Sequence, residues 1–196
     1  MAFAEPLTLA GQRVVLEPLR AEHADDLVAA ATDGELWKLW YTSVAAPDRM
    51  GADIERRLAS QRAGSMLPFA VIHPLTGKAV GMTTYMNIDA VHRRVEIGST
   101  WYAKSVQRTG LNTEAKLLLL GHAFDTLDCI AVEFRTHWMN QQSRAAIARL
   151  GARQDGILRN HQIASDGTLR DTVVFSIIAS EWPAVKSHLA YRLASS

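Results

Sequence analysis

Apolar residues recur along this chain with two different spacings, and the spacing predicts which segments are strands and which are helices. Short runs rich in β-branched and aromatic residues predict strands. An apolar residue at every third or fourth position predicts a helix. The predicted strands are Leu7–Glu17, Leu67–Ile72, Ala79–Asn87, Val95–Tyr102, Ile130–His137, Gln154–Ala164 and Thr168–Ile178. The predicted helices are Ala21–Thr32, Pro47–Arg62, Thr113–Thr126, Gln141–Leu150 and Trp182–Leu193.

The order of these elements predicts an α/β fold with one mixed, mostly antiparallel sheet. Turn residues at 74–77 and 165–167 join two antiparallel hairpins. The fourth and fifth strands flank a helix, and a strand–helix–strand unit makes its two strands parallel. We therefore expect a twisted sheet of about seven strands with helices on both faces. Because no repeat or linker interrupts the pattern, we expect a single domain over residues 1–196.

Composition and charge narrow the class of partner and the compartment. The chain is 48% hydrophobic and 21% charged, and its formal net charge is +1, so it offers no field that would attract nucleic acid or an anionic membrane. The single cysteine, Cys129, allows no disulfide within the chain. With no leader pattern and no segment long enough to span a membrane, we expect a cytoplasmic protein. The histidines lack the paired spacing of a metal site, so we expect no metal.

The main chemical signal lies between Trp101 and Lys116. A strand ends, a loop with one glycine follows, and a helix begins, with Asn112 or Thr113 as the predicted N-cap. A loop of this kind collects free backbone N–H groups and the positive end of a helix dipole, which suits a phosphate or pyrophosphate. The segment lacks the P-loop pattern, and Gly110 is its only glycine, so it is not a dinucleotide-binding turn.

The spacing Gln107-x-x-Gly110-x-Asn112 resembles the pyrophosphate-binding turn of the GCN5-related N-acetyltransferase (GNAT) superfamily. Asn112 departs from the Gly or Ala usual there, although Asn tolerates left-handed backbone well. A second segment, in which Asn140 and Ser143 open a helix, resembles another motif of that family. The two motifs in this order most resemble the RimJ/RimL-like branch, which acetylates the N-termini of ribosomal proteins.

This resemblance implies transfer of an acetyl group from acetyl-CoA to an amine. It also implies that the fourth and fifth strands splay apart and that the acyl carrier lies in the V between them. The residues implied to bind the carrier are Gly98, Thr100, Tyr102, Gln107, Arg108, Thr109, Gly110, Leu111, Asn112, Thr113, Asn140, Ser143 and Arg144.

Transfer to an amine requires a base, because a primary amine is largely protonated at neutral pH. Glu96 is the candidate base, and strand alternation places it on the same face as Gly98. The alternative role for Glu96 is an ion pair with Arg93, Arg94 or a neighbouring strand.

Two further residues are candidates for the chemistry. Gly98, inside a strand, indicates a bulge, and in the family a free N–H at such a bulge polarises the thioester carbonyl. Close packing is the alternative at this position. The resemblance implies that Ser143 donates a proton to the departing thiolate. Asn140 and Ser143 also fit an ordinary helix N-terminus.

Aromatic residues indicate the acceptor side of the site. An apolar wall suits an amino acid or a peptide or protein N-terminus better than a polycationic sugar, whereas packing on the core is the alternative role for the rings. The candidate substrate-binding residues are Trp37, Trp40, Tyr41 and Trp138. The arginines of the second helix, Arg56, Arg57 and Arg62, are expected on its solvated face.

Other functions remain open from the sequence. The chain could be a catalytically silent CoA-binding sensor or interaction module, or it could bind peptide N-termini without modifying them. Transfer of a longer acyl chain is a variant of the leading hypothesis. The closing helix and exposed aromatic residues could form a homodimer face, but no pattern in the sequence decides this.

Overall fold

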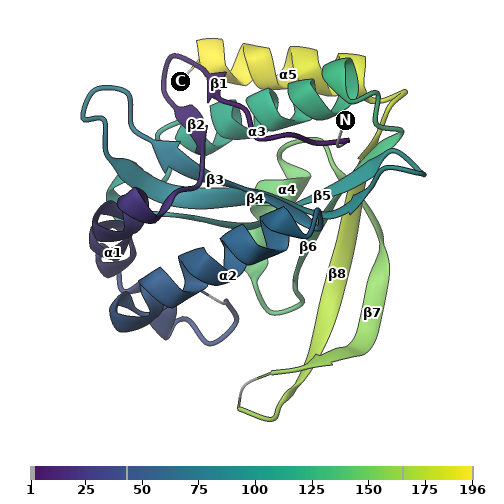
Figure 1. The fold of residues 1–196 in the computed structure, drawn as a ribbon. Helices are drawn as coiled ribbons and strands as arrows, with labels where there is room; N and C mark the ends of the chain where they lie inside the picture. The colour runs from purple at the N-terminus through teal and green to yellow at the C-terminus, as the bar shows by residue number, and fades with distance from the viewer. Residues whose placement is uncertain (1–2, 43, 165, 196) are drawn as a thin grey trace.

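The computed structural model describes residues 3–42, 44–164 and 166–195. Its centre is an eight-stranded sheet in the spatial order β1-β2-β3-β4-β5-β6-β8-β7 (Figure 1). The strands are β1 (Leu9–Ala10), β2 (Val15–Pro18), β3 (Met66–Ile72), β4 (Ala79–Asp89), β5 (Arg94–Tyr102), β6 (Ala131–His137), β7 (Arg153–Ile163) and β8 (Leu169–Ile178). All neighbouring pairs are antiparallel except β5 and β6, which are parallel. The predicted mixed sheet is confirmed.

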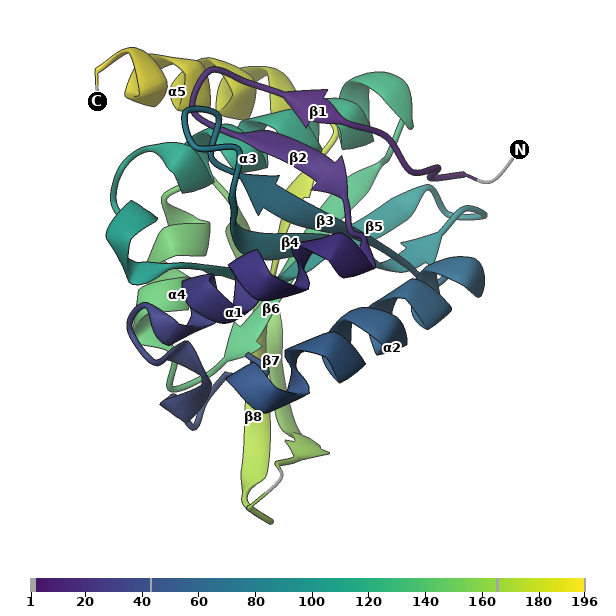
Figure 2. The ribbon, with the colours of Figure 1, turned by 60° about the vertical axis from the view of Figure 1, so that its left-hand side comes forward.

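Helices cover both faces of this sheet, as the sequence predicts. The helices are α1 (Ala24–Thr32), α2 (Met50–Arg62), α3 (Leu111–Gly121), α4 (Gln141–Ala148) and α5 (Trp182–Ala194). Figures 1 and 2 show α1 and α2 on one face and α3 and α5 on the other. The β7–β8 hairpin extends beyond the body of the sheet (Figure 1).

Each face of the sheet has its own hydrophobic core. On the α3 and α5 face, alternate strand residues such as Phe69, Val95 and Ile97 pack with helix residues such as Leu119 and Leu189. On the α1 and α2 face, Met82 and Trp101 pack with Leu27 and Ile54. Because successive residues of a strand point to opposite faces, β4 and β5 contribute to both cores and are held between them.

The parallel strands β5 and β6 are paired only near their N-terminal ends. Pairing begins with Arg94 opposite Ala131 and ends with Glu96 opposite Glu133. Both strands continue beyond that point, to Tyr102 and His137. The two strands therefore separate after Glu96, which agrees with the predicted splay.

The element boundaries differ from the prediction in ways that follow from local geometry. The predicted first strand is divided by a turn into β1 and β2, which gives eight strands in the described residues rather than about seven. The central helix ends in a π-helical turn, His122–Thr126. Among the described residues, no helix is both long enough and apolar enough to cross a membrane.

Candidate active site

Glu96 lies at the point where β5 and β6 part, and it is almost fully buried, with 6% of its surface exposed. Its Oε2 accepts a hydrogen bond of 2.7 Å from Nδ2 of Asn87, and Nε of Arg135 lies 3.5 Å from the same oxygen. The arginines next to it in sequence have other partners, since Arg93 pairs with Asp128 and Arg94 with Glu133. The arginine that faces Glu96 therefore comes from β6.

The surroundings of Glu96 favour its protonated form. Burial raises the pKa of Glu96 above its ordinary value, while the hydrogen bond from Asn87 and the charge of Arg135 lower it by less. A cavity of about 190 Å³ borders the residue, lined by Asn87, Asp89, Arg94, Val95, Glu96, Glu133 and Arg135. A buried carboxyl group with a raised pKa beside a cavity is a candidate general base.

A bulge lies in β5 next to this carboxylate, one residue later than predicted. Met82 pairs with Trp101 and Thr84 with Gly98, so one residue of β4 stands opposite both Ser99 and Thr100. Ser99 has φ of 48°, in the left-handed region. Such a bulge leaves a backbone N–H without a ladder partner.

Gly98 also leaves space for the Glu96 carboxylate. Such close packing was the alternative explanation for a glycine at this position. The Glu96 side chain lies over Gly98 on the same face, as strand alternation predicts. A Cβ at residue 98 would lie 2.9 Å from Oε1 of Glu96. The bulge and the close packing therefore occur together, at adjacent residues.

The predicted phosphate loop leads into α3, but its N-cap is not the predicted one. Gly110 is the N-cap, with φ of 82°, and α3 begins at Leu111. The predicted caps Asn112 and Thr113 lie inside the first turn, and no side chain caps the helix. The first-turn N–H groups have no intrahelical acceptor, so they point from the end of α3 toward the loop. Arg108 is exposed, with φ of 64°.

Other loop residues shape the loop from within. The Gln107 side chain donates to the backbone carbonyl of Tyr102 at 3.0 Å, and the Gln107 backbone N–H donates to the backbone carbonyl of Lys104. The Thr109 hydroxyl donates to the carbonyl of Val106 at 2.7 Å. The side chain of Leu111 is in the core. These residues hold the loop in shape, which leaves the later N–H groups as the candidates for binding a phosphate.

The second predicted motif forms the N-terminus of α4. Asn140 is its N-cap, and Oδ1 accepts a 2.9 Å hydrogen bond from the backbone N–H of Ser143. Within the part of the chain that the structure describes, the half-buried Ser143 hydroxyl makes no hydrogen bond. Arg144 stacks on the ring of Trp138, 4.2 Å from its centroid, rather than extending into solvent. The ordinary capping role of Asn140 is thus real, and the hydroxyl of Ser143 stays available.

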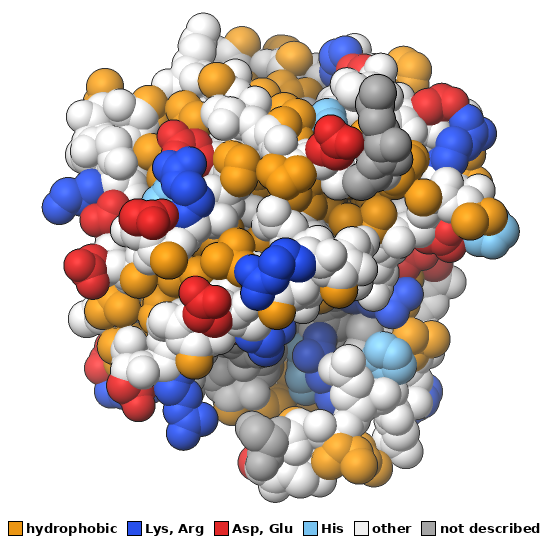
Figure 3. All heavy atoms as spheres, viewed as in Figure 1, with side chains coloured by type: hydrophobic (Ala, Val, Ile, Leu, Met, Phe, Trp, Pro, Cys, Tyr) orange, Lys and Arg blue, Asp and Glu red, His pale blue; other side chains and the backbone are white. Residues whose placement is uncertain are grey.

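The four predicted acceptor residues do not form one cluster. Trp40 is 61% exposed, and its ring meets Tyr41 at 5.6 Å and His137 at 5.1 Å, both edge to face. Trp37 packs against the α1 and α2 core, and Trp138 lies under Arg144. The aromatic wall therefore consists of the exposed Trp40, the half-buried Tyr41 and the buried ring of His137. Figure 3 shows basic and histidine side chains in the hollow between α2 and the β7–β8 hairpin.

Sequence reasoning missed several polar residues at the centre of the site. Asn87 and Arg135 contact Glu96, and no local pattern marks either one. Arg57 was expected on the solvated face of its helix, but this prediction is wrong, since it is 2% exposed and faces the sheet. Lys116 is buried as well. Its position among the apolar residues of α3, at helical spacing from Leu119 and Leu120, was a signal that could have found it.

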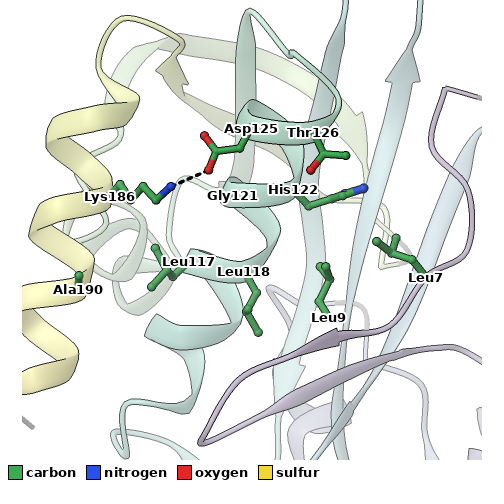
Figure 4. A pocket seen from close by; sticks show the side chains of 10 residues that line it. All are labelled: Leu7, Leu9, Leu117, Leu118, Gly121, His122, Asp125, Thr126, Lys186 and Ala190. Atoms are coloured by element: carbon green, nitrogen blue, oxygen red, sulfur yellow. Dashed lines mark hydrogen bonds and ion pairs between the residues drawn. The ribbon is translucent and has the colours of Figure 1, made fainter.

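A larger cavity, of about 500 Å³, lies on the other side of the sheet, away from Glu96. It is bordered by the N-terminal segment, α3 and α5 (Figure 4). Its lining is mainly apolar, with Leu7, Leu9, Leu117 and Leu118 facing it. Lys186 and Asp125 form a 2.8 Å ion pair beside it. None of the predicted site residues borders this cavity.

Comparison with known proteins decides the family. The sequence model described as "Acetyltransferase (GNAT) domain" matches residues 13–153. The chain belongs to the GNAT family of acetyltransferases. These enzymes use acetyl-CoA as the acyl donor. The match covers both motifs and the two splayed strands, β5 and β6.

Individual relatives of this GNAT chain agree with the family assignment. A curated protein of Bacillus subtilis, "Putative ribosomal N-acetyltransferase YdaF", is 33% identical over 110 residues. The match covers 56% of this chain and 59% of that protein. A GCN5-related N-acetyltransferase from Brucella melitensis has a similar solved structure, with a TM-score of 0.84 and 34% identity over 97% of this chain and 86% of that one. RimJ of Mycobacterium smegmatis, solved with CoA-disulfide, has a TM-score of 0.80 and 27% identity over 95% of each chain.

The residues of this GNAT chain fit acetyl-CoA in the predicted cleft. The hydroxyl of Tyr102 and Nε of Arg144 are buried and have no hydrogen-bond partner among the described residues. Both residues were predicted to bind the carrier. Buried polar atoms without a partner are rare in a folded protein and call for an explanation, and a polar ligand provides one. The uncapped start of α3 adds a site for the pyrophosphate.

Proposed function

We propose that this GNAT protein transfers the acetyl group of acetyl-CoA to a primary amine at the N-terminus of a peptide or protein, or of an amino acid. The observation that carries the proposal is the parting of β5 and β6 directly after Glu96. The buried carboxylate of Glu96 lies where the gap opens, and the bulge at Ser99 follows it on the same strand, β5. Donor and acceptor could meet in this gap.

Three groups of the protein would act on the bound acetyl-CoA and the amine: the Glu96 carboxylate, a backbone N–H and the Ser143 hydroxyl. Acetyl-CoA supplies the acetyl group as a thioester. Glu96 accepts the proton of the amine, directly or through a water. A backbone N–H at the bulge donates to the carbonyl oxygen, which gains negative charge during the attack. As the C–N bond forms and the C–S bond breaks, the hydroxyl of Ser143 donates a proton to the departing thiolate and regains one from water. The Ser143 hydroxyl makes no hydrogen bond among the described residues that competes with its task, and a bulge leaves a backbone N–H without a ladder partner.

The carrier would be held along the cleft by the predicted residues. The pyrophosphate binds the N–H groups from Arg108 to Thr113 at the start of α3, where the helix dipole favours an anion. The adjacent arm follows β5, with Gly98, Thr100 and Tyr102 beside it. Asn140 and Arg144 border the arm from α4. Two of these contacts would satisfy the buried Tyr102 hydroxyl and Nε of Arg144.

The acceptor is proposed from the wall and from the relatives. Trp40 and His137 form an aromatic pair on the face of the sheet that carries Glu96, because Glu133, Arg135 and His137 alternate along β6. An aromatic wall suits the first side chains of a peptide. The name of the Bacillus subtilis relative, a putative ribosomal N-acetyltransferase, supports a protein N-terminus as acceptor here.

A thiol-release assay with acetyl-CoA tests the proposal. The panel holds free amino acids, peptides with varied N-termini, polyamines and aminoglycosides, and succinyl-CoA is compared as donor. We expect release with peptides, a loss of at least about 100-fold in kcat for Glu96→Gln, and a smaller loss for Ser143→Ala. Tight binding of CoA by calorimetry with no release for any amine would refute the enzyme and favour a silent CoA-binding module.

A second experiment tests the acceptor wall. Trp40→Ala should raise KM for the peptide about tenfold and leave KM for acetyl-CoA unchanged, since the ring contributes contact area to the acceptor only. Tyr191→Ala is the matched control, because Tyr191 is also an exposed aromatic residue, 72% exposed, and lies on α5. An equal effect of both substitutions on KM for the peptide would exclude the proposed wall.

A further inference from the structure

The bulge in β5 has a backbone that its own sequence does not stabilise. Ser99 is in the left-handed region, with φ of 48°. A residue with a Cβ pays roughly 1–2 kcal/mol for this conformation. Such strained backbone persists only where the surroundings hold it. The contacts of the two bulge residues, Ser99 and Thr100, show what holds them.

Arg57 contacts the bulge from the α2 face. Its Nη2 donates to Oγ of Ser99 at 2.7 Å, and its Nη1 donates to Oγ1 of Thr84 at 3.2 Å. Its Nε donates to Oδ2 of Asp53 at 2.6 Å, on the same helix. One planar guanidinium thus joins α2, β4 and the bulge. The directions of these three hydrogen bonds are fixed relative to one another, because the guanidinium is planar and rigid.

Lys116 contacts the bulge from the opposite face, from α3. Its Nζ donates to Oγ1 of Thr100 at 2.7 Å and to Oγ1 of Thr83 at 3.1 Å. Thr83 is the residue of β4 that stands opposite the bulge. Figures 1 and 2 show α2 and α3 on the two sides of the sheet. The two residues of the bulge are therefore held by two basic side chains, one from each face.

Folding stability alone does not account for Lys116. It is 5% exposed, and no carboxylate of the described residues forms an ion pair with it. Burying a charged amine without an anionic partner costs free energy. The hydroxyls of Thr83 and Thr100 are 2.8 Å apart and can satisfy each other without it. A lysine that weakens the fold at this position needs another reason to be there.

We propose that Arg57 and Lys116 are positioning residues that together fix the bulge of β5, so that its free backbone N–H points at the carbonyl oxygen of the thioester. The inference rests on the proposed role of this N–H in acetyl transfer. With Ser99 held on one face and Thr100 on the other, the peptide group between them cannot rotate. A donor fixed in advance stabilises developing charge without reorganisation during the reaction.

The first test uses Lys116→Met, which keeps the length of the side chain and removes the charge. We expect kcat to fall about 10- to 100-fold, KM for acetyl-CoA to change less than about threefold, and the protein to be no less stable to urea. Thr100→Val should give a smaller loss of the same kind. Unchanged kcat in Lys116→Met would overturn the role of Lys116.

The second test uses Arg57→Lys, which keeps the charge but not the fork. We expect a similar fall in kcat, and Ser99→Ala, which removes one of its acceptors, should show a partial loss that is not additive with Arg57→Lys. Arg56→Gln is the matched control, since Arg56 binds the same Asp53 at 2.5 Å but lies on the exposed side of α2. If Arg56→Gln lowers kcat as much as Arg57→Lys does, the loss of kcat comes from a general disturbance of α2 and the proposal is wrong.

A direct measurement separates this inference from the function on which it rests. The infrared stretch of the ¹³C-labelled carbonyl of bound acetyl-CoA reports the hydrogen bond to its oxygen. We expect a lowered frequency in the wild-type protein and a frequency closer to that of free acetyl-CoA in Lys116→Met and Arg57→Lys. No lowering in the wild type would contradict the role of the bulge itself. A lowering that persists in both variants would contradict only the positioning by Arg57 and Lys116.

Discussion

The carboxylate of Glu96 lies over Gly98, so close that a Cβ at residue 98 would be 2.9 Å from Oε1. The sulfur of Met86 would be equally near that Cβ, at 2.9 Å. Both atoms are at the far ends of flexible side chains. An added methyl group would therefore displace the carboxylate and the thioether rather than the backbone. The Glu96 carboxylate, the candidate base, can therefore occupy its observed position only because residue 98 has no side chain.

Gly98→Ala should therefore reduce activity more than stability. We expect kcat/KM to fall at least about tenfold, because the carboxylate moves by a fraction of an ångström or more, and the free energy of unfolding to fall by about 1 kcal/mol or less. Thiol release and urea unfolding measure the two quantities. Gly156→Ala, in β7 with no atom within 4 Å of the added Cβ, should change neither. Full activity in Gly98→Ala would show that the carboxylate is not needed at this place.

The raised pKa of Glu96 predicts the pH dependence of the reaction. A base works only when ionised, so kcat/KM should rise with pH through a pKa above that of an ordinary glutamate. Asn87 donates to the ionised form, so its removal should raise the pKa of Glu96 further and move the acidic limb of the profile to higher pH. Asn87→Gly is the suitable variant, because residue 87 has φ of 46° and glycine accepts this conformation.

The protonation of the amine also affects this profile, so the variant and the wild type are compared with the same peptide. Its contribution is then equal in both, and the difference reports the carboxylate. An acidic limb that stays in place, or that moves to lower pH in Asn87→Gly, would exclude Glu96 as the group that titrates.

Gly110 should matter for the affinity of the protein for CoA. The residue caps α3 with φ of 82°, and alanine would pay about 1–2 kcal/mol there or turn the first N–H groups of the helix away. We expect Gly110→Ala to raise Kd for CoA about tenfold by calorimetry. Gly77→Ala is the control, since Gly77 also has a left-handed φ, of 66°, in the turn between β3 and β4, with open space around it. Gly77→Ala should lower the free energy of unfolding by a similar amount and leave Kd for CoA unchanged.

Lys116 predicts a specific change of stability with pH. Burial lowers the pKa of Lys116 from 10.5 to about 7. Between these two values the unfolded chain holds a proton that the folded chain lacks, so stability rises with pH over this window, by up to about 1.4 kcal/mol per unit. Below pH 7 the folded protein carries the full cost of the buried charge.

Lys116→Met should remove this rise. We expect the variant to be more stable than the wild type by on the order of 5 kcal/mol near pH 6, and the difference to shrink steadily from pH 7 toward pH 10. Urea unfolding across this range measures it, and other titrating groups contribute equally to both proteins. A constant difference between the two proteins would mean that Lys116 stays charged in the folded state at all these pH values.

The sequence by itself determined the order and type of the main elements and the place of the phosphate loop. Residue spacing records which face of a helix or strand is buried, so the antiparallel hairpins and the parallel pair around α3 could be predicted. The loop from Gln107 to Asn112 and the start of α4 are local motifs, which can be recognised from a few consecutive residues. The candidate base was found because strand alternation places Glu96 beside Gly98.

Only the tertiary structure decided the partners of these residues. Asp53 and Arg57 have the spacing of a solvated helical ion pair, and only the packing of α2 on the sheet places Arg57 against Ser99. Asn87 and Arg135 reach Glu96 from two other strands. Except for the pair Asp53 and Arg57, these contacts join residues of different helices and strands. Local periodicity carries no information about such contacts, because it reports the burial of a residue and not the neighbour against which it is buried.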